Sequence, residues 1–272
     1  MKYQMIVLDL DGTLTNAKKE ITPKTKTALM KAQQMGVRVV LASGRPTYGI
    51  TPLADELEIG KYGGFIMSFN GGKITDWSDH EVLFEQKLNE ELVPQIYQKA
   101  RNAGMHILTY QGEGIAATNK NDQYVQHEAF INKMPVEQYD DFLRQIKYPI
   151  NKCLVVGDPI PLHELELHMA KEMEGKISVY RSADFFLECV PLGIDKAQSL
   201  ERLITKLGIK RENIIACGDG YNDLSMIKYA GLGVAMANAA EEVKQSADYV
   251  TLSNEEDGVA HVVEKFITNI VK

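Results

Sequence analysis

Met5-Ile6-Val7-Leu8-Asp9-Leu10-Asp11-Gly12-Thr13 is the stretch that decides how the rest of the chain is arranged. Its first four residues form an apolar run of the length of one buried strand. Asp9 and Asp11 follow where that strand ends, and the two-residue period of extended backbone allows their side chains to converge on one point. Gly12 permits a turn that other residues resist. Neighbouring carboxylates repel each other, so the pattern indicates a hard cation such as Mg²⁺ and an oxyanion substrate. A strand ending in an ordinary Asx-type turn is the alternative.

The bulk composition limits the classes of protein to consider. The chain has 272 residues, of which 44% are hydrophobic and 25% charged, which is enough for a sizeable core and argues against disorder. A net charge of −7 argues against nucleic acid or an anionic membrane as the main partner. Cys153, Cys189 and Cys217 are odd in number and far apart, which indicates buried free thiols of a reducing compartment. No apolar run approaches the roughly 20 residues of a membrane helix, and no signal peptide precedes the first strand. We therefore expect a cytoplasmic protein, either a monomer or a weak homo-oligomer.

The segments after the opening stretch predict a β-α-β unit with adjacent parallel strands. Thr22 and Pro23 are typical of a helix start, Gly36 of its end, and residues 37–42 form a second apolar strand. That strand ends in Ser43-Gly44-Arg45, where a hydroxyl and a glycine amide can hold phosphate oxygens. The guanidinium of Arg45 can either steer anions or form a salt bridge at the next helix. A helix around 52–57 and a strand over 64–69 follow.

Between about 83 and 190 the pattern of the chain changes. We expect helices over 89–103, 122–131, 136–146 and 161–174 and strands over 105–110, 115–118, 152–156, 177–181 and 185–190. Helices and hairpins are intermixed here, which is typical of an α+β domain rather than continued β-α-β winding. The sequence thus predicts a first part of the core over 1–82, an insert over 83–190 and a second part of the core over 191–272.

The chemistry-bearing residues resume with Lys196, which opens a helix predicted over 197–207. A cation is disfavoured at a helix N-terminus, so Lys196 is better explained if it faces an anion. A buried strand over 213–217 then leads into Gly218-Asp219-Gly220-Tyr221-Asn222-Asp223. Strands over 233–236 and 249–250 and helices over 241–246 and 257–270 complete the expected elements.

Asp9-Leu10-Asp11-Gly12-Thr13, Ser43-Gly44-Arg45, Lys196 and the Asp219–Asp223 segment resemble, in order and spacing, the four signatures of the haloacid-dehalogenase-like (HAD) phosphatases. The insert resembles the larger, C2-type cap of the Cof-like subfamily, which includes bacterial broad-range sugar phosphatases. The resemblance implies an α/β fold, with a Rossmann-like parallel sheet core and an inserted α+β cap. Ala197 departs from the family pattern, which has glycine after the lysine, but the charge of Lys196 is retained.

The same resemblance implies a role for each motif residue. Asp9 is the expected nucleophile and Asp11 the acid and base. Mg²⁺ is held by the Asp9 and Asp219 carboxylates and the Asp11 backbone carbonyl, and Asp223 supports the site from behind. Phosphate oxygens are bound by a further set of residues, namely Leu10 through the loop amides, Ser43, Gly44, Lys196 and Asn222. A small phosphorylated metabolite, such as a sugar phosphate, is the implied substrate, hydrolysed through an aspartyl-phosphate.

Several other features leave alternatives open. Asn70 can touch substrate or merely close a hairpin. Some polar and aromatic side chains of the insert can contact substrate or belong to its own core and surface, namely Tyr110, Gln111, Asn119, Tyr124 and His127. The segment 112–117 matches a dinucleotide-binding pattern but opens no helix, and His163 and His168 have the wrong spacing for a zinc site. A phosphotransferase or mutase, and a non-catalytic phosphometabolite sensor, are the competing functions.

Overall fold

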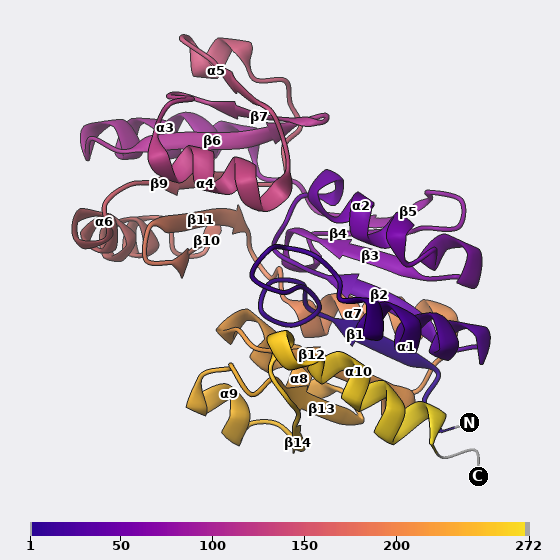
Figure 1. The fold of residues 1–272 in the computed structure, drawn as a ribbon. Helices are drawn as coiled ribbons and strands as arrows, with labels where there is room; N and C mark the ends of the chain where they lie inside the picture. Colours follow the sequence, from indigo (N-terminus) through magenta and orange to yellow (C-terminus); the bar gives the residue numbers. More distant parts are fainter. Residues whose placement is uncertain (1, 270–272) are drawn as a thin grey trace. The chain divides into compact units, whose positions relative to one another are not determined.

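The computed structural model describes residues 2–269, which form two compact units (Figure 1). The first comprises residues up to Glu85 together with those from Asp195 onward, and the second comprises Gln86–Ile194. The boundaries expected at 82/83 and 190/191 both fall inside strands, namely β5 (Val82–Glu85) and β11 (Phe186–Pro191). None of the helices in the described part combines the length and apolar character that a membrane span requires.

An eight-stranded sheet forms the centre of the first unit, in the order β14-β13-β12-β1-β2-β3-β4-β5. The pairs from β14 to β3 are parallel, whereas β3, β4 and β5 pair in antiparallel fashion. Its strands are β1 (Met5–Leu8), β2 (Arg38–Ala42), β3 (Phe65–Ser68), β4 (Lys73–Asp76), β5 (Val82–Glu85), β12 (Ile214–Gly218), β13 (Leu232–Ala235) and β14 (Tyr249–Val250). The predicted parallel α/β core is therefore confirmed.

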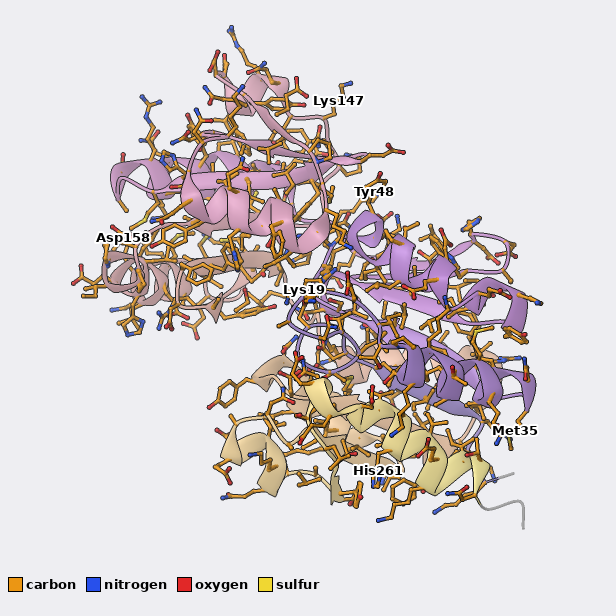
Figure 2. The ribbon with its side chains drawn as sticks, viewed as in Figure 1. Lys19, Met35, Tyr48, Lys147, Asp158 and His261 are labelled. Atoms are coloured by element: carbon orange, nitrogen blue, oxygen red, sulfur yellow. The ribbon has the colours of Figure 1, made fainter. Side chains whose placement is uncertain are left out.

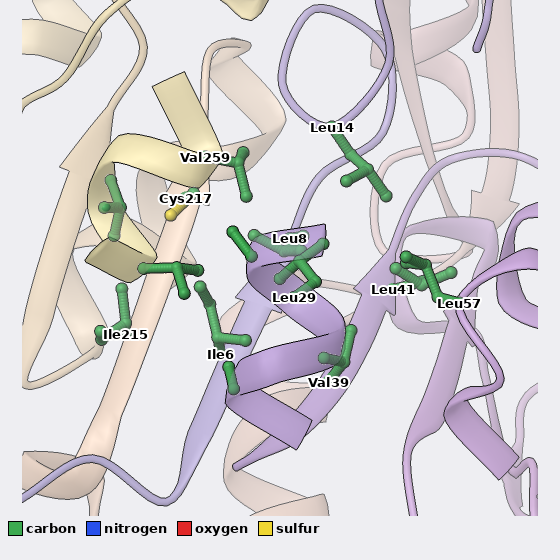
Figure 3. Packing of buried hydrophobic residues seen from close by; sticks show 14 of the residues in the cluster. Ile6, Leu8, Leu14, Leu29, Val39, Leu41, Leu57, Ile215, Cys217 and Val259 are labelled. Carbon is green, nitrogen blue, oxygen red and sulfur yellow. The ribbon is translucent and has the colours of Figure 1, made fainter. Parts of the chain in front are cut away.

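The central strands bury side chains on both faces, which is why they form continuous apolar runs in the sequence. One face packs against helices α1 and α10, and Figure 3 shows side chains such as Ile6, Leu29 and Val259 meeting there. The opposite face holds Met5 and Val7 with residues of α7 and α8. The helices of this unit are α1 (Pro23–Gln34), α2 (Thr47–Glu56), α7 (Lys196–Leu207), α8 (Leu224–Tyr229), α9 (Glu241–Gln245) and α10 (Gly258–Val263).

Two helices of the first unit differ in extent from the prediction. Helix α2 begins at Thr47, ahead of the expected 52–57, and it includes Pro52 within its length. The expected helix over 257–270 consists of α10 and a π-helical stretch over Glu264–Thr268, and its last predicted residue lies outside the described part. Short 3₁₀ turns occupy Ile59–Tyr62, Phe69–Gly71, Glu90–Leu92, Arg211–Asn213, Tyr221–Asp223 and Asn254–Glu256.

The second unit is built on a six-stranded sheet in the order β10-β11-β9-β6-β7-β8, antiparallel except for the β7–β8 pair. Its strands are β6 (His106–Gln111), β7 (Gly114–Ala117), β8 (Val136–Gln138), β9 (Cys153–Val156), β10 (Ile177–Ala183) and β11 (Phe186–Pro191). Its helices are α3 (Val93–Asn102), α4 (Gln123–Asn132), α5 (Phe142–Gln145) and α6 (Pro159–Glu172). Apolar side chains of α3, α5 and α6 pack in one cluster of this sheet and those of α4 in another. The α+β character of the insert is confirmed.

The helix predicted over 136–146 was wrong. Val136 pairs with Ile115 of β7, so the first residues of this segment extend the sheet as β8. Only Phe142–Gln145 is helical. The edge strand β7 has backbone groups that can pair with this segment, and the hydrogen bonds formed there outweigh the local preference for a helix.

Candidate functional site

The ammonium of Lys196 joins two of the predicted site residues. Its Nζ lies 2.7 Å from Oδ1 of Asp9 and 2.6 Å from Oδ1 of Asp223, and its side chain is fully buried. Asp195 caps the N-terminus of α7 by accepting from the backbone N–H groups of Ala197 and Gln198, which places Lys196 at the first position of the helix. Burial by itself would lower the pKa of Lys196, but the two carboxylates outweigh it and raise that pKa, so Lys196 is an ammonium.

The carboxylate of Asp219 lies beside the opening loop. Thr13 donates its hydroxyl to Oδ1 of Asp219 at 2.7 Å. Gly12 has a φ of +85°, and a Cβ on this residue would come within 2.2 Å of Oδ2 of Asp219. Glycine is therefore required at this position both by the backbone conformation and by the close approach of Asp219. Burial, opposed by the Thr13 bond and supported by the charge of Asp223, raises the pKa of Asp219 to about 6.

The oxygens of Asp9, Asp219 and Asp223 gather within 4.8 Å of one another. Burial, together with the charge of Asp223, raises the pKa of Asp9 well above its ordinary range, and Lys196 opposes this rise only in part. Asp223 is already occupied, because its Oδ2 accepts from the backbone N–H groups of Asp219 and Gly220 while its Oδ1 faces Lys196. Asp9 and Asp219 thus remain as carboxylates with too little positive charge beside them. This donor set fits a hard divalent cation.

Asp11 has different surroundings, although it is only two residues from Asp9. Arg45 forms a two-pronged contact with its carboxylate, with Nε 2.8 Å from Oδ2 and Nη2 2.6 Å from Oδ1. The ammonium of Lys19, on the loop between β1 and α1 (Figure 2), lies 2.7 Å from the same Oδ1. Burial would raise the pKa of Asp11, but Arg45 and Lys19 outweigh it and hold that pKa below its usual value. The Asp11 side chain does not belong to the cluster of Asp9 and Asp219.

The predicted phosphate-binding residues lie at the same carboxyl edge of the sheet. Ser43 follows β2 and is buried, and its hydroxyl accepts from the backbone N–H of Arg45 at 3.2 Å. Asn222, in the turn after β12, donates from Nδ2 to Oδ1 of Asn70 at 3.1 Å. The carboxamide of Asn70 packs against Gly44, where an added Cβ would lie 3.3 Å from Nδ2 of Asn70. The turns after β2, β3 and β12 therefore meet.

The comparison with known proteins accords with this geometry. Residues 6–263 match the family described as haloacid dehalogenase-like hydrolase. The chain belongs to the haloacid dehalogenase-like hydrolases. A solved haloacid dehalogenase-like hydrolase from Bacteroides thetaiotaomicron shares 54% identity and a TM-score of 0.95, with 98% of this chain and 100% of that one covered. The resemblance drawn from the four motifs is thereby confirmed.

Two curated relatives come from Bacillus subtilis (strain 168), and both are named 5-amino-6-(5-phospho-D-ribitylamino)uracil phosphatase. YcsE is 33% identical over 267 residues, covering 97% of this chain and 96% of its own length. YwtE is 28% identical over 287 residues, covering 97% and 98%. These relatives match this HAD hydrolase across both of its units.

Sequence reasoning missed three contributors to the site. Lys19 lies in a loop with no apolar pattern, and nothing in the sequence links it to Asp11. Thr13 was part of the quoted motif, but its bond to Asp219 joins residues 206 positions apart. Arg45, just before α2, forms a salt bridge, as one of the two roles considered for it supposed, but the partner is Asp11, which the sequence did not indicate. An arginine two residues after a strand-end serine was the only available signal.

The candidates of the second unit are engaged within that unit. Tyr110 donates its hydroxyl to Glu128, Tyr124 donates to Asp158, and Asn119 contacts His106. His127 packs against Phe185, and Gln111 bonds to the backbone of Lys147. His163 and His168 are exposed beside glutamates of their own helix, as expected of surface histidines. Cys153, Cys189 and Cys217 are buried and free, as predicted for the thiols themselves.

Proposed function

We propose that this protein is a Mg²⁺-dependent phosphatase of small phosphorylated metabolites, in particular sugar phosphates, that acts through an aspartyl-phosphate on Asp9. The general reaction, hydrolysis of phosphoric monoesters, follows from the family and from the named relatives. The observation that carries the finer proposal is the buried Asp9 carboxylate, held at 2.7 Å by Lys196 beside Asp219. A residue that only bound phosphate would not need to be a buried carboxylate, because a carboxylate repels the anion.

Each half of the proposed reaction uses groups of this chain. An oxygen of Asp9 attacks phosphorus, the bond from phosphorus to the ester oxygen breaks, and Asp11 supplies the proton that the leaving oxygen takes up. In the second half a water attacks phosphorus, Asp11 accepts its proton, and the bond to Asp9 breaks. Lys196, Ser43, Asn222 and the loop amides, Leu10 among them, stabilise charge on the transferred group.

The cation would be held by the carboxylates of Asp9 and Asp219 and the backbone carbonyl of Asp11. When bound, Mg²⁺ supplies positive charge that offsets the repulsion between the phosphate and the carboxylates. Asp223 stays outside this ligand set, because its oxygens are taken by Lys196 and two backbone N–H groups, and it orients Lys196 from behind.

The second unit is proposed as a cap of the C2 type that selects the substrate. Its place in the sequence, between the second and third signatures, supports this role. The named substrate of YcsE and YwtE carries its phosphate on a ribityl chain, a polyhydroxylated carbon chain like that of a sugar. This likeness supports esters of polyhydroxylated molecules as the substrate class.

A panel of phosphate esters tests the proposal. Hexose 6-phosphates, pentose 5-phosphates, the ribitylaminouracil phosphate and an aryl phosphate would be incubated with the protein and Mg²⁺, and released inorganic phosphate measured. We expect release from several of these esters by the natural chain and from none by Asp9→Asn. Transfer of the phosphoryl group to a second sugar without release would favour a mutase. Binding without turnover by the natural chain would favour a sensor.

A further inference from the structure

The turn after β3 has an unusual backbone. Phe69, Asn70 and Gly71 follow one another with φ values of +54°, +56° and +94°. Asparagine tolerates this left-handed region, but a bulky residue such as phenylalanine rarely enters it. Strained conformations of this kind persist only where the surroundings hold them, and they concentrate at functional sites.

Backbone hydrogen bonds tie this turn to the second signature. The N–H of Phe69 donates to the carbonyl of Arg45 at 3.0 Å, and the N–H of Asn70 donates to the carbonyl of Ser43 at 2.8 Å. The turn therefore fixes the backbone of the segment that carries Ser43 and Gly44. A hairpin that merely joined β3 to β4 would not need these bonds.

A second set of contacts ties the same turn to helix α7. The carbonyl of Gly71 accepts from the hydroxyl of Ser199 at 2.8 Å, and Ser199 is fully buried. A Cβ on Gly71 would approach that hydroxyl oxygen to 2.5 Å. Ser199 lies three residues after Lys196 on the same helix, so the position of the Phe69–Gly71 turn and that of Lys196 depend on each other.

The side chain of Asn70 supplies the third connection. It is 7% exposed, and its Oδ1 accepts one N–H of the Asn222 carboxamide at 3.1 Å. Asn222 itself is exposed, and the bond to Asn70 restrains the rotation of its carboxamide. With one N–H of Nδ2 engaged by Asn70, the direction of the other N–H is fixed.

We propose that Asn70 is a positioning residue of the phosphate site, which fixes the Asn222 carboxamide as a ready-made donor while its turn aligns the segments of Ser43 and Lys196. This inference rests on the proposed phosphate-binding role of Asn222. Asn70 acts through Asn222 and is not itself a catalytic residue. A donor fixed before the anion arrives loses less conformational freedom on binding, so the side chain of Asn70 contributes to affinity for the phosphate group.

Asn70→Gly separates the side chain from the backbone of the turn. Glycine adopts a positive φ without strain, so the turn is kept while the bond to Asn222 is lost. We expect the inhibition constant for inorganic phosphate and the KM for a phosphate ester to rise about three- to tenfold, the usual effect of one lost hydrogen bond. The value of kcat should change less than KM, because the lost contact is made to bound substrate and transition state alike.

A double-variant comparison decides whether the effect passes through Asn222. Asn222→Ala should raise the same two constants. The double variant Asn70→Gly/Asn222→Ala should have the same inhibition constant and KM as Asn222→Ala alone. Additive losses would overturn the inference. Glu58→Gly is the matched control, since Glu58 also has a positive φ of +49° in the same unit and should leave both constants unchanged.

Asn70→Asp provides a second test. Aspartate tolerates the same backbone and keeps an acceptor for Asn222, but it adds a negative charge beside the proposed anion. We expect inorganic phosphate to inhibit Asn70→Asp more weakly than it inhibits Asn70→Gly. Inhibition of Asn70→Asp by inorganic phosphate as strong as that of the natural chain would place Asn70 away from the anion and overturn the inference. If the natural chain neither released nor bound phosphate, the proposed function would fail together with the inference. If the natural chain released phosphate and Asn70→Gly had the same inhibition constant and KM as the natural chain, the inference alone would fail.

Discussion

Replacing Lys196 with methionine is the most informative perturbation of the site. The ammonium of Lys196 is 0% exposed and lies 2.7 Å from Asp9 and 2.6 Å from Asp223, whose side chains are 8% and 1% exposed. Methionine fills a similar volume without the charge. Lys196→Met therefore leaves two buried carboxylates without their cation, and removal of one partner from a buried ion pair typically costs about 3–5 kcal/mol. We expect a loss of stability of that size in EDTA at pH 7.5, together with loss of activity.

The stability of Lys196→Met relative to the natural chain should depend on pH in a defined direction. Without Lys196 the pKa of Asp9 in the folded state moves further above that of the unfolded chain, because the cation that lowered it is gone. A carboxyl group whose pKa is raised by folding holds its proton more tightly when folded, so the folded state gains stability as the pH falls through that pKa. The deficit relative to the natural chain should shrink between pH 7.5 and pH 5.5.

Urea unfolding at both pH values, followed by circular dichroism, measures this deficit. Lys196→Met combined with Asp223→Asn should recover part of the stability but none of the activity, because one of the unpaired charges is removed with its partner. Lys206→Met, on the same helix with a side chain 55% exposed, is the control and should change stability by no more than about 0.5 kcal/mol. A stable Lys196→Met, or a deficit that is the same at both pH values, would refute the electrostatic account of this cluster.

Three further outcomes are expected. Asp9→Asn should abolish turnover of every substrate. Asp11→Asn should slow the hydrolysis of alkyl esters by about 10²–10⁴, and with an aryl phosphate it should release a burst of about one equivalent of phenol, measured by rapid quench. The absence of a burst would contradict the roles of the two aspartates. EDTA should remove activity, Mg²⁺ should restore it and excess Ca²⁺ should inhibit it, and full activity in metal-free buffer would argue against the cation site. Arg45→Ala should raise the pKa of Asp11 and so shift the acid limb of the pH–rate profile for hydrolysis of the intermediate to higher pH. An unshifted limb would show that Asp11 is not the titrating base.

The sequence predicted well those features that depend on local patterns. The strand before Asp9 and the residues 214–217 are continuous apolar runs that lead within two residues to an aspartate, so both the strands and the edge they share could be inferred. The approach of Lys196 to an anion was inferred from its unfavourable place at a helix start. That anion is the pair formed by Asp9 and Asp223.

Features that depend on long-range contacts could not be predicted from the sequence. Val136–Gln138 is a strand because β7 offers it an edge, which a helical pattern cannot reveal. Strand β4 follows the strained turn of Phe69–Gly71, where glycines indicated a turn but not the addition of two antiparallel strands to the core. The contact of Lys19 with Asp11 comes from a loop residue with a φ of +61°, a conformation that lysine seldom adopts and no local pattern predicts.

The two aspartates of the opening motif owe their different proposed roles to their neighbours rather than to the motif. Asp9 is buried among carboxylates with the ammonium of Lys196 in contact, so it gains from a cation and is held rigidly for attack. Asp11 is one-third exposed and faces two cations, so its carboxylate stays ionised and open to solvent. An ionised carboxylate accepts the proton of an attacking water directly, but it must first be protonated to act as an acid. The contacts of Arg45 and Lys19 therefore favour the second half of the proposed reaction at the expense of the first, and esters with poor leaving groups should react faster as the pH falls, as long as Asp9 remains ionised.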